Sequence, residues 1–285
     1  SDGVKVLAGW CWPRLPWIMF STVAVVGAGT MGQGIAQLLL EAGLTVHIYD
    51  RSPGALGLAV DAITRRLQRR TEAETRSAGS LRVVESVDQL GDADLVIEAV
   101  PEHLELKRTV FAELDRHLPP AAILASNTSG LDIDVLAQAT TRPQCVVGLH
   151  FFNPPPLMPL VELVPAATTD GAVLDVVRAF TESLGKTAIT VANRPGFIVN
   201  RLLFAMIAEA GRILDEGETS AQDVDRALCL GASHPIGPLA LADFIGLDVS
   251  LDILESLASG LGERYTPPSS LRDLVAQGHL GRKSG

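Results

Sequence analysis

Short apolar runs alternate with longer amphipathic stretches over most of this chain. Each run has about the length of a buried strand, and the stretches between several of them repeat their apolar residues every three or four positions, as helices do. This alternation predicts an α/β fold in which helices cover a mostly parallel sheet. Strands are expected at residues 22–26, 45–49, 81–84, 95–99, 121–125, 146–149, 160–164 and 187–191. Helices between them are expected from after Gly32 to about residue 42 and at residues 53–71, 102–117 and 169–184, the last with Thr169 as its N-cap.

Beyond residue 191 the strand pattern ends, and only helices are expected. Residues 1–20 fit neither period and form an extension of unknown role. We therefore expect an α/β domain at 21–193 and a smaller all-helical domain at 194–285. The apolar, weakly charged helices of the second domain favour a homodimer interface. These helices are expected at residues 197–216, 221–230, 249–258 and 271–277, with an ordered kink at 234–238.

A glycine-rich turn joins the first predicted strand to the first predicted helix. Gly27 permits the tight turn, Gly29 lets the backbone approach a pyrophosphate, and Gly32 lets the helix pack on the strand. The next strand ends in Asp50, which can bind ribose hydroxyls and would repel a 2′-phosphate, although Arg51 weakens this preference. The unit predicts a Rossmann-type dinucleotide-binding domain that prefers NAD to NADP.

A second polar feature lies within residues 148–162. His150 ends an apolar run, and the four prolines that follow exclude a helix. Glu162 then occupies a position in the next apolar run where a buried strand would not normally hold an acid. A histidine with a carboxylate brought back by a rigid loop is an oriented general base. A core histidine and a surface glutamate are the structural alternative.

Several polar residues are expected along one rim of the sheet, because ligands of open parallel sheets bind beyond the carboxyl ends of the strands. Ser129 could instead cap the helix that follows it. Asn200 lies near the start of a helix on an apolar flank, and such a group needs a buried partner. The residues expected on the rim with the glycine turn are Asp50, residues 98–102, Asn127, Ser129 and His150.

Composition narrows the classes of function. The net charge of −10 does not indicate nucleic-acid binding, and no apolar run reaches the roughly 18 residues of a membrane span. Cys11, Cys145 and Cys229 fit no metal-ligand spacing, and so sparse a set suggests reduced thiols in a cytoplasmic compartment. From the first residue, Ser1, and the last, Gly285, we expect a processed chain or a segment of a longer one.

One predicted helix carries four arginines. Arg65 and Arg69, and likewise Arg66 and Arg70, are four positions apart and so share a flank of the helix at 53–71. A solvated face explains them simply. They could also dock a phosphate-rich substrate tail that the acidic protein would otherwise repel.

These motifs together resemble the 3-hydroxyacyl-CoA dehydrogenase family, which includes 3-hydroxybutyryl-CoA dehydrogenases. The resemblance runs from about Thr22 to Gly285, and residues 280–285 are similar to the start of the family's C-terminal motif. It rests on residues 27–36, 96–102, 126–129, 150–162, 195–201, 235–238 and 243–248.

The resemblance implies reversible NAD-dependent oxidation of an (S)-3-hydroxyacyl-CoA, as in fatty-acid or short-chain acyl-CoA metabolism. His150 matches the catalytic base and Glu162 its orienting partner, while Ser129 and Asn200 match residues that hold the substrate oxygens and the histidine geometry. The residues matched to the NAD site are Gly27, Gly29, Thr30, Met31, Gly32, Asp50, Glu102, Lys107, Asn127, Asn153 and Lys283.

The sequence departs from the family pattern at three places. Gly130 stands where a second serine is common, arginines replace lysines on the helix at 53–71, and the aromatic-rich segment that usually follows Lys283 is missing. Two other functions fit the residues. One is an NAD-dependent dehydrogenase of a hydroxy acid or sugar acid without CoA, and the other is a non-catalytic dinucleotide-binding relative.

Overall fold

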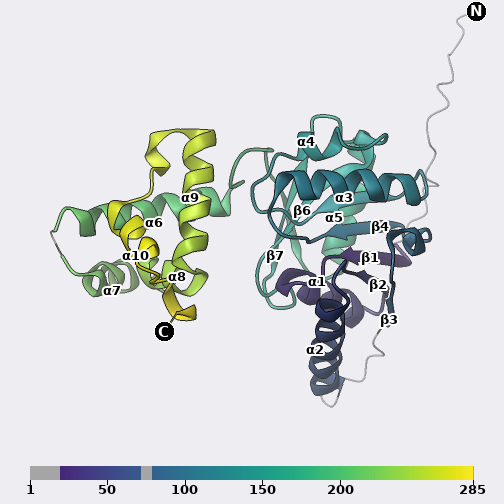
Figure 1. Cartoon of the computed structure of the whole chain (residues 1–285), viewed down its shortest axis with the longest axis horizontal. Helices are drawn as coiled ribbons and strands as arrows, with labels where there is room; N and C mark the ends of the chain where they lie inside the picture. Colours follow the sequence, from purple (N-terminus) through teal and green to yellow (C-terminus); the bar gives the residue numbers. More distant parts are fainter. Residues whose placement is uncertain (1–19, 72–78, 218, 285) are drawn as a thin grey trace, which may run out of the picture.

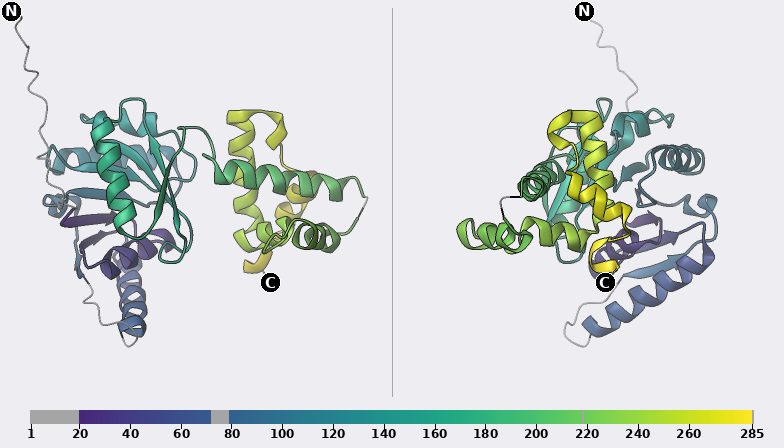
Figure 2. Two further views of the ribbon diagram at one scale, coloured as in Figure 1. Left: turned by 180° about the vertical axis from the view of Figure 1, so that it is seen from behind. Right: turned by 60° about the vertical axis from the view of Figure 1, so that its left-hand side comes forward.

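The chain folds into a sheet domain and a separate helical domain joined by a short link (Figures 1 and 2). This computed structural model describes residues 20–71, 79–217 and 219–284. The predicted extension at 1–20 therefore lies almost wholly outside the described residues. Within them, no helix is both long enough and apolar enough to cross a membrane.

The sheet has eight strands in the order β3-β2-β1-β4-β5-β6-β7-β8. All neighbours pair in parallel except β6 and β7, which are antiparallel. Strand order reverses beside β1, whose neighbours are β2 on one side and β4 on the other, and this point is where open α/β sheets bind ligands. The strands are β1 (Thr22–Val26), β2 (Thr45–Tyr49), β3 (Ser80–Val83), β4 (Leu95–Glu98), β5 (Ile123–Ser126), β6 (Val146–Phe151), β7 (Leu160–Pro165) and β8 (Thr187–Thr190).

Helices cover both faces of the sheet, because successive strand residues point to opposite sides. Val23 and Val25 pack in one core with α1, α2 and α5, whereas Ala24 and Val26 pack in the other with α3 and α4. Figure 1 shows α3 crossing one face while α1 and α2 lie along the other. These helices are α1 (Thr30–Glu41), α2 (Pro53–Thr71), α3 (Leu104–His117), α4 (Ile133–Ala137) and α5 (Gly171–Ser183).

The helical domain has its own apolar core, with Phe204, Ile207, Leu254 and Leu257 at its centre. Residues 191–198 link it to the sheet domain, between the end of β8 and the start of α6. The helices are α6 (Val199–Asp215), α7 (Ala221–Gly231), α8 (Pro238–Ile245), α9 (Leu247–Leu261) and α10 (Ser269–Ala276).

The structure confirms the α/β class and corrects several details. Helix α8 was not predicted, because Pro238 was assigned to a kink, whereas it is the first residue of the helix, where proline is well tolerated. Asp170, not Thr169, caps α5, accepting a hydrogen bond from the N–H of Ala172. The Thr169 hydroxyl instead donates to the carbonyl of Val146.

Candidate active site

The glycine turn has the backbone shape that its sequence predicts. Gly27 has φ +107°, and a Cβ there would lie 2.6 Å from the backbone of Ala99. A Cβ on Gly32 would lie 1.8 Å from the carbonyl oxygen of Gly27, so neither position accepts a side chain. Gly29, in contrast, faces open space, and the start of α1 has no side-chain cap. Exposed Thr30 and half-buried Met31 follow it. Free N–H groups at an open helix start form an anion site.

Asp50 is fixed beside this turn. One carboxylate oxygen accepts a hydrogen bond from the N–H of Ala28 at 2.8 Å, and the other accepts one from the N–H of Ser52 at 2.8 Å. An acid held next to an uncapped helix start, with room for a ligand over Gly29, fits the ribose and pyrophosphate of a dinucleotide. The described residues therefore fit NAD.

His150 and Glu162 face each other on adjacent strands. The antiparallel register of β6 and β7 pairs the two residues directly, and His150 Nδ1 lies 2.8 Å from Glu162 Oε2. Both side chains are buried, which rules out the alternative of a surface glutamate. The predicted contact is therefore confirmed, although β6 runs on to Phe151, so that His150 lies inside the strand and not beyond its end.

Aromatic rings pack against this histidine. The ring centroids of Phe152 and Phe197 lie 4.5 and 5.6 Å from that of His150. Phe197 is buried and adopts φ +47°, a strained conformation for a residue with a side chain. The sequence analysis expected a helix to begin at residue 197 and gave Phe197 no role at the histidine, whereas α6 begins at Val199.

The second oxygen of Glu162 binds the start of α6. Glu162 Oε1 accepts hydrogen bonds from the N–H groups of Ile198 and Val199, both at 3.1 Å. Burial raises the pKa of the Glu162 carboxyl, but the hydrogen bonds from His150 and from these amides outweigh burial and lower the pKa overall. Glu162 is thus an ionised acceptor that joins the histidine to the helical domain.

Because an ionised carboxylate can only accept a hydrogen bond, Nδ1 of His150 carries the hydrogen. The lone pair then lies on Nε2, which is the atom available as a base. The imidazolium that forms when Nε2 takes a proton is stabilised by Glu162 at 2.8 Å. This pair can abstract a proton from a hydroxyl group and return it.

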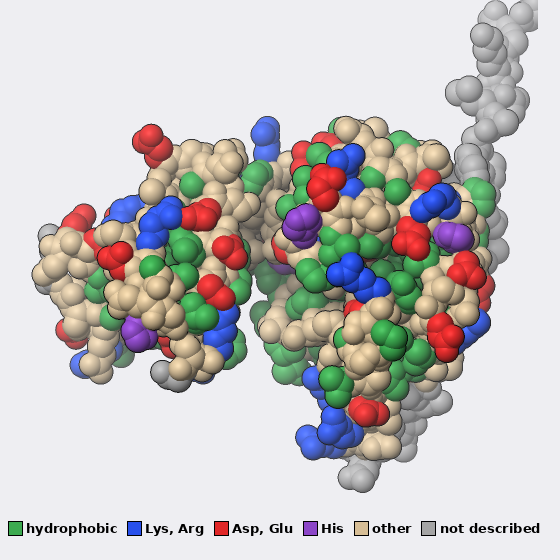
Figure 3. Space-filling model, viewed as in Figure 1, with side chains coloured by type: hydrophobic (Ala, Val, Ile, Leu, Met, Phe, Trp, Pro, Cys, Tyr) green, Lys and Arg blue, Asp and Glu red, His purple; other side chains and the backbone are tan. Residues whose placement is uncertain are grey.

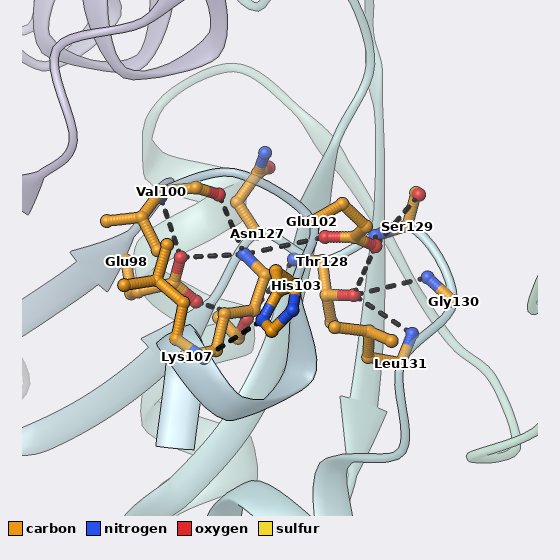
Figure 4. Close-up of polar contacts among 12 residues, drawn as sticks. Glu98, Val100, Glu102, His103, Lys107, Asn127, Thr128, Ser129, Gly130 and Leu131 are labelled. Atoms are coloured by element: carbon orange, nitrogen blue, oxygen red, sulfur yellow. Dashed lines mark hydrogen bonds and ion pairs between the residues drawn. The ribbon is translucent and has the colours of Figure 1, made fainter. Parts of the chain in front are cut away.

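A second polar network lies at the ends of β4 and β5 (Figure 4). Glu98 is fully buried and accepts hydrogen bonds from Lys107 Nζ, Ser126 Oγ and the N–H of Val100, each at 2.7 Å. Burial raises the pKa of the Glu98 carboxyl, against the opposing pull of the Lys107 ammonium. The sequence analysis placed Glu98 on the rim without a role, although it resembles Glu162 as an acid inside an apolar run.

Glu102 holds the loop that carries Ser129. Its Oε1 accepts hydrogen bonds from the hydroxyls of Thr128 and Ser129, at 2.6 and 3.1 Å, and from the N–H of Ser129 at 2.8 Å. Its Oε2 lies 3.4 Å from Lys107 Nζ. A Cβ on the neighbouring Gly130 would lie 3.1 Å from the N of Gly196, so the loop closely approaches the link between the domains.

The remaining site residues occupy different surroundings. Lys107, expected at the cofactor, is 1% exposed and lies beneath Glu102, so its ammonium does not reach solvent. Asn127 is nearly buried, and its Oδ1 accepts a hydrogen bond from the N–H of Phe151. Asn153 is exposed, and Asn200 is half-buried at the second position of α6. Lys283 lies in the helical domain, where its ammonium pairs with Asp248.

Basic side chains gather on α2, as Figure 3 shows at the lower end of the sheet domain. Arg65, Arg66 and Arg69 are exposed there. The side chain of Arg70 lies outside the described part. The predicted basic flank is therefore on the surface, where it can meet an anion.

Comparison with known proteins gives one consistent result. Residues 22–194 match the model of the 3-hydroxyacyl-CoA dehydrogenase NAD binding domain, and residues 196–285 match that of the 3-hydroxyacyl-CoA dehydrogenase C-terminal domain. A probable 3-hydroxybutyryl-CoA dehydrogenase from Bacillus subtilis is 45% identical over 272 residues, covering 92% of this chain and 94% of the relative. A 3-hydroxybutyryl-CoA dehydrogenase from Bradyrhizobium diazoefficiens is 44% identical, covering 92% of each chain.

Comparison with solved structures indicates the same family. The crystal structure of (S)-3-hydroxybutyryl-CoA dehydrogenase from Ralstonia eutropha superposes with a TM-score of 0.88 at 41% identity, covering 94% of this chain and 97% of that one. The family models together cover both domains. The chain belongs to the 3-hydroxyacyl-CoA dehydrogenase family.

Proposed function

We propose that this protein catalyses the reversible NAD-dependent oxidation of an (S)-3-hydroxyacyl-CoA to the 3-oxoacyl-CoA. The observation that carries the proposal is the buried contact of 2.8 Å between His150 and Glu162, in a domain whose glycine turn fits NAD. The named relatives support the same chemistry, since they are 3-hydroxybutyryl-CoA dehydrogenases. Short acyl chains are therefore the first substrates to test.

Each residue of the proposed active site has its own role in the reaction. Nε2 of His150 takes the proton of the 3-hydroxyl group, and Glu162 holds the ring and stabilises its positive charge. Ser129 and Asn200 bind the substrate oxygens and keep the reacting carbon in line with the histidine. NAD, when bound, supplies the hydride acceptor. In the reverse direction His150 returns the proton to the oxygen.

The decisive experiment is NADH oxidation with acetoacetyl-CoA and with longer 3-oxoacyl-CoAs. His150→Ala should fold and bind NADH but lose about a hundred- to ten-thousand-fold in kcat, because the general acid–base group is gone. Glu162→Gln should lose activity as well, since the imidazolium loses its counter-charge. His279→Ala, which removes an exposed histidine of the helical domain, is the matched control and should remain active.

Other outcomes of this assay have clear meanings. Full turnover by a folded His150→Ala enzyme would contradict the assigned role. Turnover of 3-oxo acids without CoA, but not of their CoA thioesters, would point to a hydroxy-acid or sugar-acid dehydrogenase. NADH binding without turnover of any substrate would point to a non-catalytic relative.

The surface of α2 supports a CoA thioester as substrate. Arg65, Arg66 and Arg69 present three cations on an otherwise acidic protein, and the phosphates of CoA are the matching anions. The NAD contacts that we propose centre on the glycine turn and Asp50, with Glu102, Asn127 and Asn153 near the nicotinamide half and Lys283 from the helical domain. Lys107 would contribute to the NAD site indirectly, by holding Glu102, because its own ammonium is buried and does not reach a bound ligand.

We also propose a homodimer formed through the helical domain. Large apolar side chains are exposed on five of its helices, α6 to α10, and such surfaces are usually covered in an assembly. They include Leu202, Leu230, Phe244, Val249 and Leu274. A cytoplasmic location fits the free thiols of Cys145 and Cys229.

A further inference from the structure

A buried acid lies where the nucleotide turn and the Ser129 loop meet. Glu98 ends β4, pairs in register with Val26 of β1 and Ser126 of β5, and is fully buried. β1 leads into the glycine turn and β5 leads into the loop at 127–130. Glu98 therefore lies between the two segments that must be aligned for hydride transfer.

Burying a carboxylate is expensive unless several donors compensate it. Glu98 has three donors, all at 2.7 Å: the Lys107 ammonium, the Ser126 hydroxyl and the N–H of Val100. Its own carbonyl oxygen accepts a hydrogen bond from the N–H of Asn127 at 2.8 Å. An apolar residue at position 98 would be buried with a smaller loss of free energy. We therefore expect the carboxylate charge to have a role in the active site.

Glu98 is connected to Ser129 by a chain of three polar contacts, through Lys107 and Glu102 (Figure 4). Lys107 lies between two acids, 2.7 Å from Glu98 Oε1 and 3.4 Å from Glu102 Oε2. Glu102 in turn binds the hydroxyl and the N–H of Ser129 and the hydroxyl of Thr128. A second route is direct, because Ser126 Oγ donates to Glu98 and accepts from the N–H of Thr128.

We propose that Glu98 is a positioning residue for the dehydrogenase site, holding Lys107 and Ser126 so that Glu102 and the loop at 127–130 present Ser129 to the substrate. This inference rests on the proposed function for its effect on turnover. It assigns a role to a residue whose side chain is fully buried. In this proposal Glu98 affects turnover only by positioning Ser129, and the experiments below test that dependence.

Glu98→Gln keeps the size of the side chain and removes the charge. Its amide group would face donors on both sides, so Lys107 or Ser126 would lose its acceptor. We expect kcat with acetoacetyl-CoA to fall by about tenfold to a hundredfold, as when a catalytic group is slightly displaced. Glu105→Gln, on the exposed side of the same helix α3, is the matched control and should keep its activity.

A double-mutant cycle separates positioning from plain structural support. If Glu98 acts through Ser129, Glu98→Gln should cost much less in a Ser129→Ala background than in the wild type. An equal loss in both backgrounds would overturn the proposal. Should Glu98→Gln not fold, Ser126→Ala removes one partner of Glu98 more gently, and the same dependence on Ser129 is expected of it.

A readout that needs no substrate keeps this test independent of the proposed function. The N–H groups of Ser129, Gly130 and Leu131 are all hydrogen-bonded within the network. Hydrogen–deuterium exchange of the peptide that spans 127–131 should speed up in Glu98→Gln and not in Glu105→Gln. Unchanged exchange would refute the positioning role, whereas a wild-type enzyme inactive on every 3-oxoacyl-CoA would refute the function alone.

Discussion

Charged side chains inside this protein are each held by several partners. Asp115 is an example remote from the active site, near the C-terminal end of α3. Its carboxylate accepts hydrogen bonds from the N–H and hydroxyl of Thr141 at 2.7 and 2.8 Å, and from Arg142 Nε at 2.6 Å. Arg142 is buried too, so the pair fixes the loop before β6 to α3. Removing one charge would leave the other without its counter-ion.

The Asp115 pair gives a prediction about stability and pH. Burial raises the pKa of the Asp115 carboxyl, but the hydrogen bonds from Thr141 and Arg142 outweigh burial and hold the pKa below its ordinary value. Such a group stabilises the fold above the carboxyl's unfolded pKa, and this contribution disappears as the pH falls through the folded pKa. Asp115→Asn should therefore cost about 1.5–3 kcal/mol at neutral pH.

Denaturant unfolding at a series of pH values checks this expectation. The difference in unfolding free energy between wild type and Asp115→Asn should shrink as the solution becomes acidic. Asp61→Asn, on the exposed part of α2, should change stability little at any pH. A difference that stays constant down to acidic pH would show that the carboxylate charge contributes nothing.

Among the elements, the proline loop between β6 and β7 is held from two sides. Pro155 packs on α1 at Gly34, where a Cβ would lie only 2.6 Å from the proline Cδ. On the other side Lys186 Nζ donates to the carbonyls of Pro156 and Met158, at 3.1 and 2.9 Å. The loop therefore ties the strands of His150 and Glu162 to the helix that starts at the glycine turn.

Two glycine-to-alanine substitutions test this docking. Gly34→Ala should push Pro155 off α1, lower stability by about 1–3 kcal/mol and reduce turnover, because overpacking displaces the loop. Gly57→Ala on α2 is the matched control, since a Cβ there meets nothing within 4 Å and should add about 0.5–1 kcal/mol to stability. Thermal unfolding and kcat report both effects. Equal stability of the two variants would contradict the docking.

Local patterns predicted the elements better than they predicted the contacts. The strands Thr22–Val26 and Thr45–Tyr49 begin and end where expected, because turn residues bound each apolar run. The His150–Glu162 contact was also predictable, since an acid in an apolar strand needs a partner. Helix α8 was missed because Pro238 both ends and begins helices. The packing of Pro155 on Gly34 joins distant segments, so no local pattern reports it.

At the scale of the whole molecule, Glu162, which we propose orients the catalytic histidine, also contacts the helical domain. Its Oε2 binds His150 in the sheet domain and its Oε1 binds the first amides of α6. Gly196, with φ +71°, and the strained Phe197 precede these amides, so the link bends sharply where the carboxylate holds it. A few residues at the end of an element are the usual place for a domain hinge.

The link predicts that activity and domain arrangement can be separated. Glu162→Ala removes the acceptor for both Ile198 and Val199, so the helical domain should lean away from the sheet domain and the radius of gyration should rise in small-angle X-ray scattering. His150→Ala leaves that acceptor in place, so it should scatter like the wild type while being equally inactive. Both variants break the proposed catalytic pair, but only Glu162→Ala removes the acceptor of the two amides at the start of α6. If both scatter like the wild type at matched protein concentration, the carboxylate does not hold the domains, and the covalent link with the core around Phe197 must do so alone.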